Sequence, residues 1–436
     1  MPYHQRTVRS RLKTRQLDQS FERAVAIGGR YGPDSRKFAA ALGGFVQLTN
    51  SFQITPTFPV PAMILQKHPQ VLGAVAGKGK GAELAAHGYA HLDYTSVADF
   101  RVEKHIRNAK AVFHRHGYRR IGFRFPYLRR NPGLLAELER QALIWDSSEV
   151  VEWDVLDRSE HSTIAWDAYR RIMDTYAPRP ASGFNSLPYF IGNLVEIPVS
   201  MPDDDVLIDR MKIRKSEVLS AVWGRMLMEA WRRGEMMVFQ LHPERYFFFG
   251  EALRRLLIKA QGLGNVWTAS LGEIAEWWRE RNGLKLEFKS ISPTCTEIRC
   301  PGSGRAGLSI NDGRPDRDME IRSLRPDPNG LPRWSVSGRI KPWVGVSPEI
   351  PESDESIRFM IRHGFIFEKS RIRRGFACSV STEPGSARAA IRHLKRYPER
   401  MLRLNPWPGG RRCAFSVTGD IDGLDIWDFW SRFHAR

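Results

Sequence analysis

Cys413-Ala-Phe-Ser-Val-Thr-Gly-Asp-Ile-Asp422 is an apolar run that ends in two aspartates, only 14 residues before the end of the 436-residue chain (436 − 422 = 14). A short apolar run of this kind predicts a buried β-strand. Asp420 and Asp422 would then lie at the carboxyl end of the strand, where α/β barrels hold their active-site residues. We therefore expect the last strand of the chain to belong to the functional fold.

Three other polar motifs have a similar setting. They are His87-Gly-Tyr-Ala-His91, Arg124-Phe-Pro-Tyr127, which follows Ile121-Gly-Phe123, and Leu241-His-Pro243, which ends the run Met236–Leu241. Taken singly, each has an ordinary explanation: a histidine pair without metal, a solvated turn, or a structural His-Pro after a strand. Four such motifs in one chain, each beside an apolar run or loop, indicate a metal-assisted hydrolase.

The residue types suit that chemistry. Two imidazoles four residues apart and one carboxylate can hold a divalent ion, with zinc favoured and cobalt or iron as alternatives. A second carboxylate can accept the proton of the attacking water, and another histidine can protonate the leaving group. Arg124 would keep a neighbouring carboxylate ionised, and Tyr127 with its backbone would face the developing oxyanion.

These motifs resemble those of the NodB-like polysaccharide deacetylases, carbohydrate esterase family 4. His87-Gly-Tyr-Ala-His-Leu-Asp-Tyr-Thr95, Phe123-Arg-Phe-Pro-Tyr127 and Leu241-His-Pro243 are similar to the second, third and fifth motifs of that family, and Asp420-Ile-Asp422 to the first. The resemblance covers about residues 34–282 and the last two dozen. It implies a distorted (β/α) barrel and a metal-dependent removal of acetyl groups from sugars.

The order of the motifs departs from the family, in which the Asp-x-Asp motif opens the domain. Residues 1–33 hold no such motif. We therefore expect a circular permutation in which the first barrel strand and its helix come from the C-terminus. A truncated second copy is the rival explanation, but 14 residues cannot build a domain. Ile426, Trp427, Trp430 and Phe433 recur at helical spacing and predict an apolar stripe that packs on the barrel wall.

The resemblance also implies a role for each site residue. Asp422, His87 and His91 would be the metal ligands and Asp420 the catalytic base. Arg124 would orient that base, and His242 would be the general acid. The family has an acidic residue that orients the acid histidine, and Asp203, Asp204 and Asp205 are the candidates here, with no choice among them.

The pattern along the chain predicts an α/β fold with a smaller α+β insert. Residues 1–30 form a basic lead-in, 31–283 the NodB-like catalytic barrel, 284–412 the insert, and 413–436 a strand and helix that complete the barrel. Helices are expected at 217–233, 271–281, 351–364 and 384–404, and a pair of strands within 365–381. No catalytic group of residues is apparent in the insert.

Charge and cysteine content suggest the surroundings of the protein. The chain has 67 basic and 48 acidic residues, a formal charge of +19. Such a charge suits anionic polysaccharides, lipid headgroups or nucleic acids, although no nucleic-acid-binding motif supports the last. Four cysteines form no secreted disulfide pattern, and the N-terminus has no apolar leader, so we expect a cytoplasmic protein. No apolar run is long enough to span a membrane, which leaves peripheral membrane contact open.

The function expected from the sequence is removal of an N-acetyl or O-acetyl group by a metal-dependent hydrolase. The partner would be an acetylated amino-sugar oligosaccharide or polysaccharide, or a lipid- or nucleotide-linked precursor. Two alternatives stay open: a sugar-binding or assembly protein that has lost catalysis, and a related deformylase or amidohydrolase.

Overall fold

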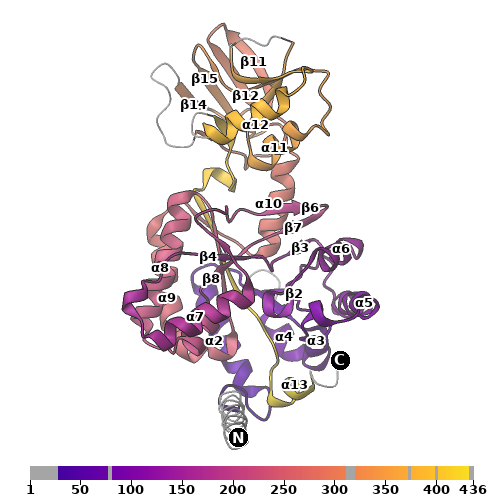
Figure 1. Cartoon of the computed structure of the whole chain (residues 1–436), viewed down its shortest axis with the longest axis vertical. Coiled ribbons are helices and arrows are strands. Elements are labelled where there is room, and N and C mark those ends of the chain that lie inside the picture. Colours follow the sequence, from indigo (N-terminus) through magenta and orange to yellow (C-terminus); the bar gives the residue numbers. More distant parts are fainter. Residues whose placement is uncertain (1–27, 77–80, 311–319, 372–374, 398–400, 432–436) are drawn as a thin grey trace, which may run out of the picture.

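The computed structural model describes residues 28–76, 81–310, 320–371, 375–397 and 401–431 (Figure 1). The basic lead-in expected at 1–30 therefore lies almost wholly outside the described residues. Within them, the chain forms an α/β fold around a mainly parallel central sheet. No helix among the described residues is long and apolar enough to cross a membrane.

The central sheet has the strand order β2-β1-β20-β9-β8-β4-β5, and β10 also pairs with β20. The strand bounds are β1 Thr57–Val60, β2 Glu83–Ala86, β4 Val150–Glu152, β5 Arg179–Pro180, β8 Val199–Met201, β9 Met236–Leu241, β10 Val266–Thr268 and β20 Cys413–Gly419. Every residue of β1, β9 and β20 is buried. Apolar runs without alternation are typical of parallel strands covered on both faces.

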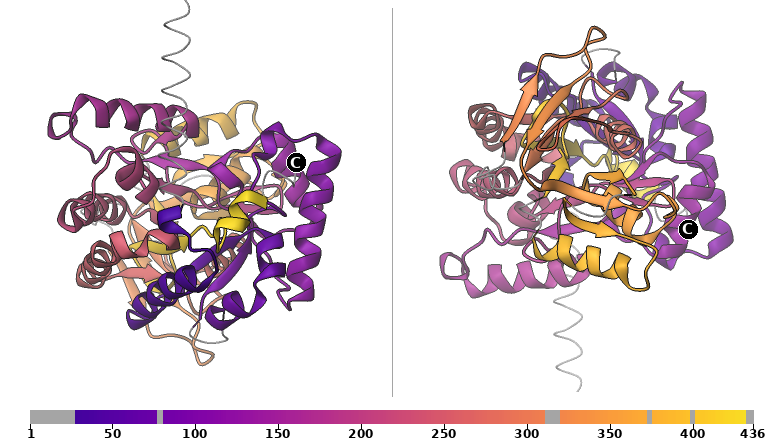
Figure 2. Two further views of the ribbon diagram at one scale, coloured as in Figure 1. Left: turned by 90° about the horizontal axis from the view of Figure 1, so that it is seen from below. Right: turned by 90° about the horizontal axis from the view of Figure 1, so that it is seen from above.

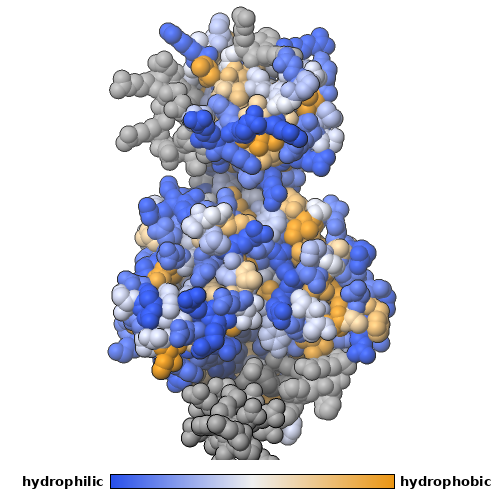
Figure 3. All heavy atoms as spheres, in the orientation of Figure 1, coloured by the Kyte–Doolittle hydropathy of each residue, from blue (hydrophilic) through white to orange (hydrophobic). Residues whose placement is uncertain are grey.

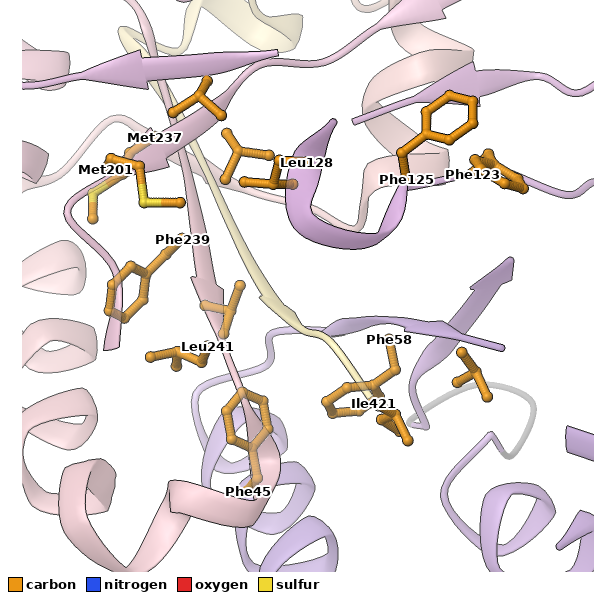
Figure 4. Packing of buried hydrophobic residues seen from close by; sticks show 14 of the residues in the cluster. Phe45, Phe58, Phe123, Phe125, Leu128, Met201, Met237, Phe239, Leu241 and Ile421 are labelled. Atoms are coloured by element: carbon orange, nitrogen blue, oxygen red, sulfur yellow. The ribbon is translucent and has the colours of Figure 1, made fainter. Parts of the chain in front are cut away.

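The last strand of the chain lies in the middle of this sheet. Residues 414–419 of β20 pair with β9 in parallel, and Thr418 pairs with Thr57 of β1. The first half of β20 also pairs with β10. Figure 4 shows β20 running beside β9, with the buried side chains of Phe239, Leu241, Phe58 and Ile421 around the two strands. Strand β20 thus shares one hydrophobic core with β1 and β9.

The expected closed barrel is not confirmed, because the strands of the described residues form no closed sheet. A second group of strands, β3 (Trp145–Asp146), β7 (Leu194–Glu196) and β6 (Tyr189–Ile191), stands beside the central sheet. Between β2 and β3 the chain makes single bridges through Phe123. The apolar run there is only three residues long, and Pro126 lacks the N–H that a longer ladder would need.

Helices cover the sheet. They are α2 Arg36–Ser51, α3 Ala62–Lys67, α4 Pro69–Val75, α5 Asp99–Arg115, α6 Pro132–Arg140, α7 Thr163–Tyr176, α8 Ser216–Arg233, α9 Tyr246–Leu263 and α10 Leu271–Asn282. In α5, Val102, Ile106, Ala109 and Phe113 recur at helical spacing and are buried. In α10, Ser270 and Glu273 form a capping box. The helices expected at 217–233 and 271–281 are confirmed.

Residues 284–412 lie at the end of the molecule beyond α10, and the surface narrows between the two parts (Figures 1 and 3). They form an antiparallel sheet β11-β12-β15-β14 and a parallel sheet β17-β16-β18. The bounds are β11 Glu287–Ser292, β12 Cys295–Arg299, β13 Leu308–Ile310, β14 Glu320–Leu324, β15 Arg333–Ser337, β16 Lys341–Val346, β17 Phe367–Lys369, β18 Phe376–Val380 and β19 Leu402–Leu404. Most of their buried apolar residues form two clusters of their own, whereas Trp407 packs against Trp267 and Trp278 of the main part.

Two helices of this region are shorter than expected. The helix predicted at 351–364 is α11, Glu355–His363. The helix predicted at 384–404 is wrong beyond its middle: α12 spans Ser386–Arg396, and Leu402–Leu404 form β19, which pairs with β13. The apolar residues Met401 and Leu402 are buried in the clusters of this region, and this packing favours the strand over a longer helix.

The C-terminal helix α13 spans Ile426–Ser431. Ile426 packs partly against the main core, but Trp427 is 62% exposed, so the expected apolar stripe is wrong at this position. The side chain of Trp430 and all of Phe433 fall outside the described residues. Polar contacts hold the helix: Asp428 accepts from the N–H of Leu424 and pairs with Lys67.

Candidate metal and acid–base site

His87, His91 and Asp422 come together at the carboxyl ends of β2 and β20. The Nε2 atom of His91 lies 3.0 Å from Oδ1 of Asp422, and Nε2 of His87 lies 3.8 Å from the same oxygen. One nitrogen or oxygen of each residue lies within 4.8 Å of the others. Both imidazoles are buried, whereas the side chain of Asp422 is 21% exposed. This group therefore opens towards solvent on the aspartate side.

A turn, not a helix, presents the two histidines. Gly88 adopts φ +80°, and a Cβ there would lie 2.5 Å from the hydroxyl oxygen of Tyr94. That hydroxyl accepts from the N–H of Tyr89 and donates to the carbonyl of Ala90, so it fastens the turn from inside. Glycine at position 88 is needed both for its left-handed backbone and for this close approach.

The orientation of His87 is set by the backbone. Its Nδ1 lies 2.8 Å from the carbonyl oxygen of Arg124, which can only accept, so Nδ1 carries the proton and Nε2 offers its lone pair towards Asp422. Burial lowers the pKa of His87 to about 4, against the opposing charges of Asp420 and Asp422. The imidazole is thus neutral near pH 7, the form in which histidine binds metals.

Asp420 is held by a buried arginine. One guanidinium nitrogen of Arg124 donates to Oδ1 of Asp420 at 2.6 Å and to the hydroxyl of Thr418 at 2.9 Å. The other two nitrogens donate to the carbonyl and hydroxyl of Ser147. Arg124 is fully buried. Asp420 compensates its charge, and the other three contacts are hydrogen bonds to neutral acceptors. The N–H of Asp420 donates to the carbonyl of Leu241, which places Asp420 beside the end of β9.

The structure resolves which aspartate accompanies His242. Asp204 accepts from Nδ1 of His242 at 2.8 Å and from its backbone N–H at 3.1 Å. Asp203 instead accepts from the N–H of Val206, and Asp205 pairs with Arg210 and Arg245. Burial acts to lower the pKa of His242, but the Asp204 carboxylate outweighs it, and the pKa lies well above its ordinary value.

Tyr127 lies at the edge of the histidine pair. Its ring meets the ring of His91 edge to face, with centroids 4.6 Å apart, and its side chain is 46% exposed. The residue adopts φ 61° within the turn Pro126–Leu128. The hydroxyl of Ser148 accepts from the N–H of Phe125 and donates to Asp146, so this turn is braced from the neighbouring strand.

Several residues of the site were not identified from the sequence. Ser147 and Thr418 complete the shell around Arg124, and Arg245 contacts Asp204 and Asp205. Glu244, two residues after His242, is buried, and its Oε2 has no hydrogen-bond partner among the described residues. Burial raises the pKa of Glu244. The sequence offered one signal for these residues: each lies within three residues of a motif named above or of a strand end.

A second group of possible ligands consists of His68, Asp425 and Asp428. The ammonium of Lys67 lies 2.6 Å from Asp428 and 3.4 Å from Asp425. The ammonium group of Lys67 therefore already neutralises these carboxylates. We interpret the group as an ion-pair network that holds α13 against the junction of α3 and α4.

No family model matches the chain, and a search of curated proteins gave no match. Solved structures are similar in part. A chain assigned as a polysaccharide deacetylase from Mycobacterium smegmatis has 20% identity and a TM-score of 0.45, over 60% of this chain and 84% of that one. One from Pseudomonas aeruginosa PAO1, also assigned as a polysaccharide deacetylase, has 18% identity and a TM-score of 0.44, over 60% and 77%. Puue allantoinase has 19% identity and a TM-score of 0.44, over 60% and 76%.

Proposed function

We propose that the protein is a metal-dependent hydrolase of the NodB-like type that removes an acetyl group, N-linked or O-linked, from an amino sugar. The substrate would be an oligosaccharide or polysaccharide, or a lipid- or nucleotide-linked precursor. One observation carries the proposal. The imidazoles of His87 and His91 and the carboxylate of Asp422 converge at one point. At the neighbouring strand ends, Asp420 accepts a hydrogen bond from Arg124, and His242 donates one to Asp204.

The donor set fits a divalent transition metal. His87, His91 and Asp422 offer two imidazole nitrogens and one carboxylate oxygen, the set found at open catalytic zinc sites and accepted by cobalt and iron. The hydrogen bond from His87 to the Arg124 carbonyl is of the kind that orients ligand histidines. These three residues would hold the metal. When bound, it would polarise the scissile carbonyl and make water more acidic.

The remaining residues divide the proton transfers between them. Arg124 donates to Oδ1 of Asp420 and so holds in place the carboxylate that would accept the proton of the attacking water. Asp204 accepts from Nδ1 of His242 and favours its charged form, so the histidine can donate the Nε2 proton to the leaving nitrogen. The backbone and ring of Tyr127 would border the developing oxyanion.

We also propose that the chain is a circular permutation of the family arrangement. The support is topological: β20, the last strand, lies between β1 and β9 in the sheet and delivers Asp420 and Asp422 from the C-terminus. A truncated second copy would leave the central position to another strand.

The test measures metal and product separately. Purified protein should bind one divalent ion per chain, and His87→Ala or Asp422→Ala should lower the metal content sharply because the first shell is incomplete. Asp420→Asn should keep the metal and slow release of acetate from acetylated amino sugars by about two to four orders of magnitude.

The outcomes separate the alternatives. Stoichiometric metal in His87→Ala would contradict the ligand assignment. A wild type that binds metal and oligosaccharide but releases neither acetate nor formate would favour the sugar-binding alternative. Release of formate alone would favour a deformylase.

A further inference from the structure

Exposed apolar side chains gather on one face of the molecule. Ten large hydrophobic side chains are exposed among the described residues, and Tyr127 is one of them. Six more lie in the first turn of a helix that follows a strand of the central sheet: Phe100, Ile164, Val218, Phe247, Phe248 and Trp427. The other three, Ile258, Ile291 and Ile340, lie elsewhere.

The topology places these first turns together. The strands of the central sheet are parallel, and each such helix starts after the carboxyl end of its strand and runs back. Their first turns therefore surround the end of the sheet where His87, His91 and Asp422 meet. The left view of Figure 2 looks at the molecule from this end, with α13 near the centre and α5 at one side. We call Tyr127 and the six residues the apolar rim.

Basic side chains accompany the rim. The segment Arg210-Met-Lys-Ile-Arg-Lys215, between β8 and α8, holds four cations and no acidic residue. Lys212, Arg214 and Lys215 are exposed, and the guanidinium of Arg214 lies over the ring of Phe248 at 5.4 Å. On α5, the guanidinium of Arg101 lies 5.7 Å from the ring of Phe100. Cations thus stand directly beside exposed aromatic rings.

This combination indicates a particular partner. Seven of the ten exposed large hydrophobic side chains lie at this one end of the sheet, and such a concentration of exposed apolar groups indicates an interaction surface. Aromatic and aliphatic side chains interleaved with Lys and Arg are typical of proteins that lie in the headgroup region of a membrane. The anionic lipids of a membrane attract such cations. The net charge of +19 acts in the same direction. A soluble acidic polymer would account for the cations but would leave the apolar rim exposed to water.

We propose that the apolar rim and the segment 210–215 dock the protein on the surface of an anionic phospholipid bilayer, with the His87–His91–Asp422 site facing the headgroups. The proposal goes beyond the hydrolysis proposed above and does not require it. It implies that the site acts on groups presented at the lipid–water boundary.

The experiment is co-sedimentation of the full-length chain with vesicles of phosphatidylcholine and phosphatidylglycerol in equal parts, compared with pure phosphatidylcholine. Wild type should bind the anionic vesicles preferentially. Phe247→Ser/Phe248→Ser should weaken that binding by about tenfold, because two rings no longer enter the interface. Lys212→Glu/Arg214→Glu should weaken it similarly and reduce its salt dependence, because fewer charges are screened.

A matched control lies in the insert. Ile291 and Ile340 are 55% and 60% exposed, close to the 65% of Phe247. They belong to residues 284–412, which lie at the end of the molecule opposite α13 (Figure 1). Ile291→Ser/Ile340→Ser should bind vesicles as wild type does. Unfolding midpoints of all variants show whether each is folded, and Phe100→Ser/Arg101→Glu provides a second rim variant on another helix.

The proposal would be overturned by no preference for anionic vesicles, by unchanged binding in both rim variants, or by equal loss of binding in the Ile291→Ser/Ile340→Ser control. Wild type that binds a soluble acidic polysaccharide but not vesicles would also overturn it. The Asp420→Asn protein should bind vesicles normally, so failure of the hydrolase proposal and failure of docking give different results.

Discussion

Arg124 shows how a single residue ties the site to the stability of the fold. Its charge is fully buried and is balanced by Asp420, while Ser147 and Thr418 accept further hydrogen bonds from its guanidinium group. Arg124→Met leaves the Asp420 carboxylate buried without its partner, so the free energy of unfolding should fall by about 3–5 kcal/mol. Urea denaturation measures this. Arg107→Met removes an exposed ion pair with Glu103 and should cost about 0.5 kcal/mol or less; equal effects would contradict our account of Arg124.

His242 gives a prediction that depends on pH. Because its pKa in the folded protein is raised by Asp204, it stabilises the fold at pH values below the unfolded pKa of about 6.5. That contribution is lost as the pH rises through the folded value. In Asp204→Asn burial prevails, so the imidazole should titrate below 6.5. Proton NMR of the imidazole at a series of pH values measures both; an unchanged titration would show that Asp204 does not set the pKa.

The same residue marks what the sequence could not reveal. Residue types and spacing identified His87, His91, His242, Asp420 and Asp422 as candidates, and the structure brings the first two and Asp422 together. The choice of Asp204 over its neighbours depends on the turn of chain at Asp205–Arg210, which directs three consecutive carboxylates to different partners. Local sequence carries no signal for that direction.

At the scale of elements, the apolar runs 236–241 and 413–417 predicted strands correctly because both are buried on two faces. Closure of the sheet was not predictable, since it depends on the pairing of very short strands: β5 and β6 are two and three residues long and do not pair with each other. The helix expected to bury Trp427 is held by polar contacts instead, because Asp428 accepts a hydrogen bond from the N–H of Leu424 and pairs with Lys67. Such contacts are not visible in the spacing of apolar residues along the sequence.

Deleting residues 413–436 tests the part played by β20. The deletion removes the partner of β1, β9 and β10 and exposes sheet edges and core. We expect loss of cooperative unfolding and strong binding of a hydrophobic dye. Trp427→Ala, which alters only an exposed side chain of the same segment, should unfold like wild type. A cooperative, dye-free truncation would show that the strand is dispensable.

For the whole molecule, residues 284–412 separate in sequence two strands that lie side by side in the sheet. α10 ends at Asn282 and β20 begins at Cys413, yet β10 and β20 are paired strands. Composition alone indicated the change at residue 284. It could not indicate that β19 would replace the end of a helix, because that strand exists only through its pairing with β13.

The termini of this arrangement suggest a test of the proposed permutation. The N–H of Ile426 donates to the carbonyl of Gly32 at 3.2 Å, so the C-terminal segment lies beside the start of the described chain. A chain rearranged to run 413–436 and then 1–412 keeps every strand contact and opens the backbone between Arg412, which is exposed, and β20. It should fold cooperatively and bind the same amount of metal as wild type.

A matched permutant opened within β9, between Val238 and Phe239, should not fold, because both residues are buried in the middle of the sheet. If the first permutant is as unfolded as the second, the order of the motifs in this chain is a requirement of its fold, and a simple permutation does not describe it.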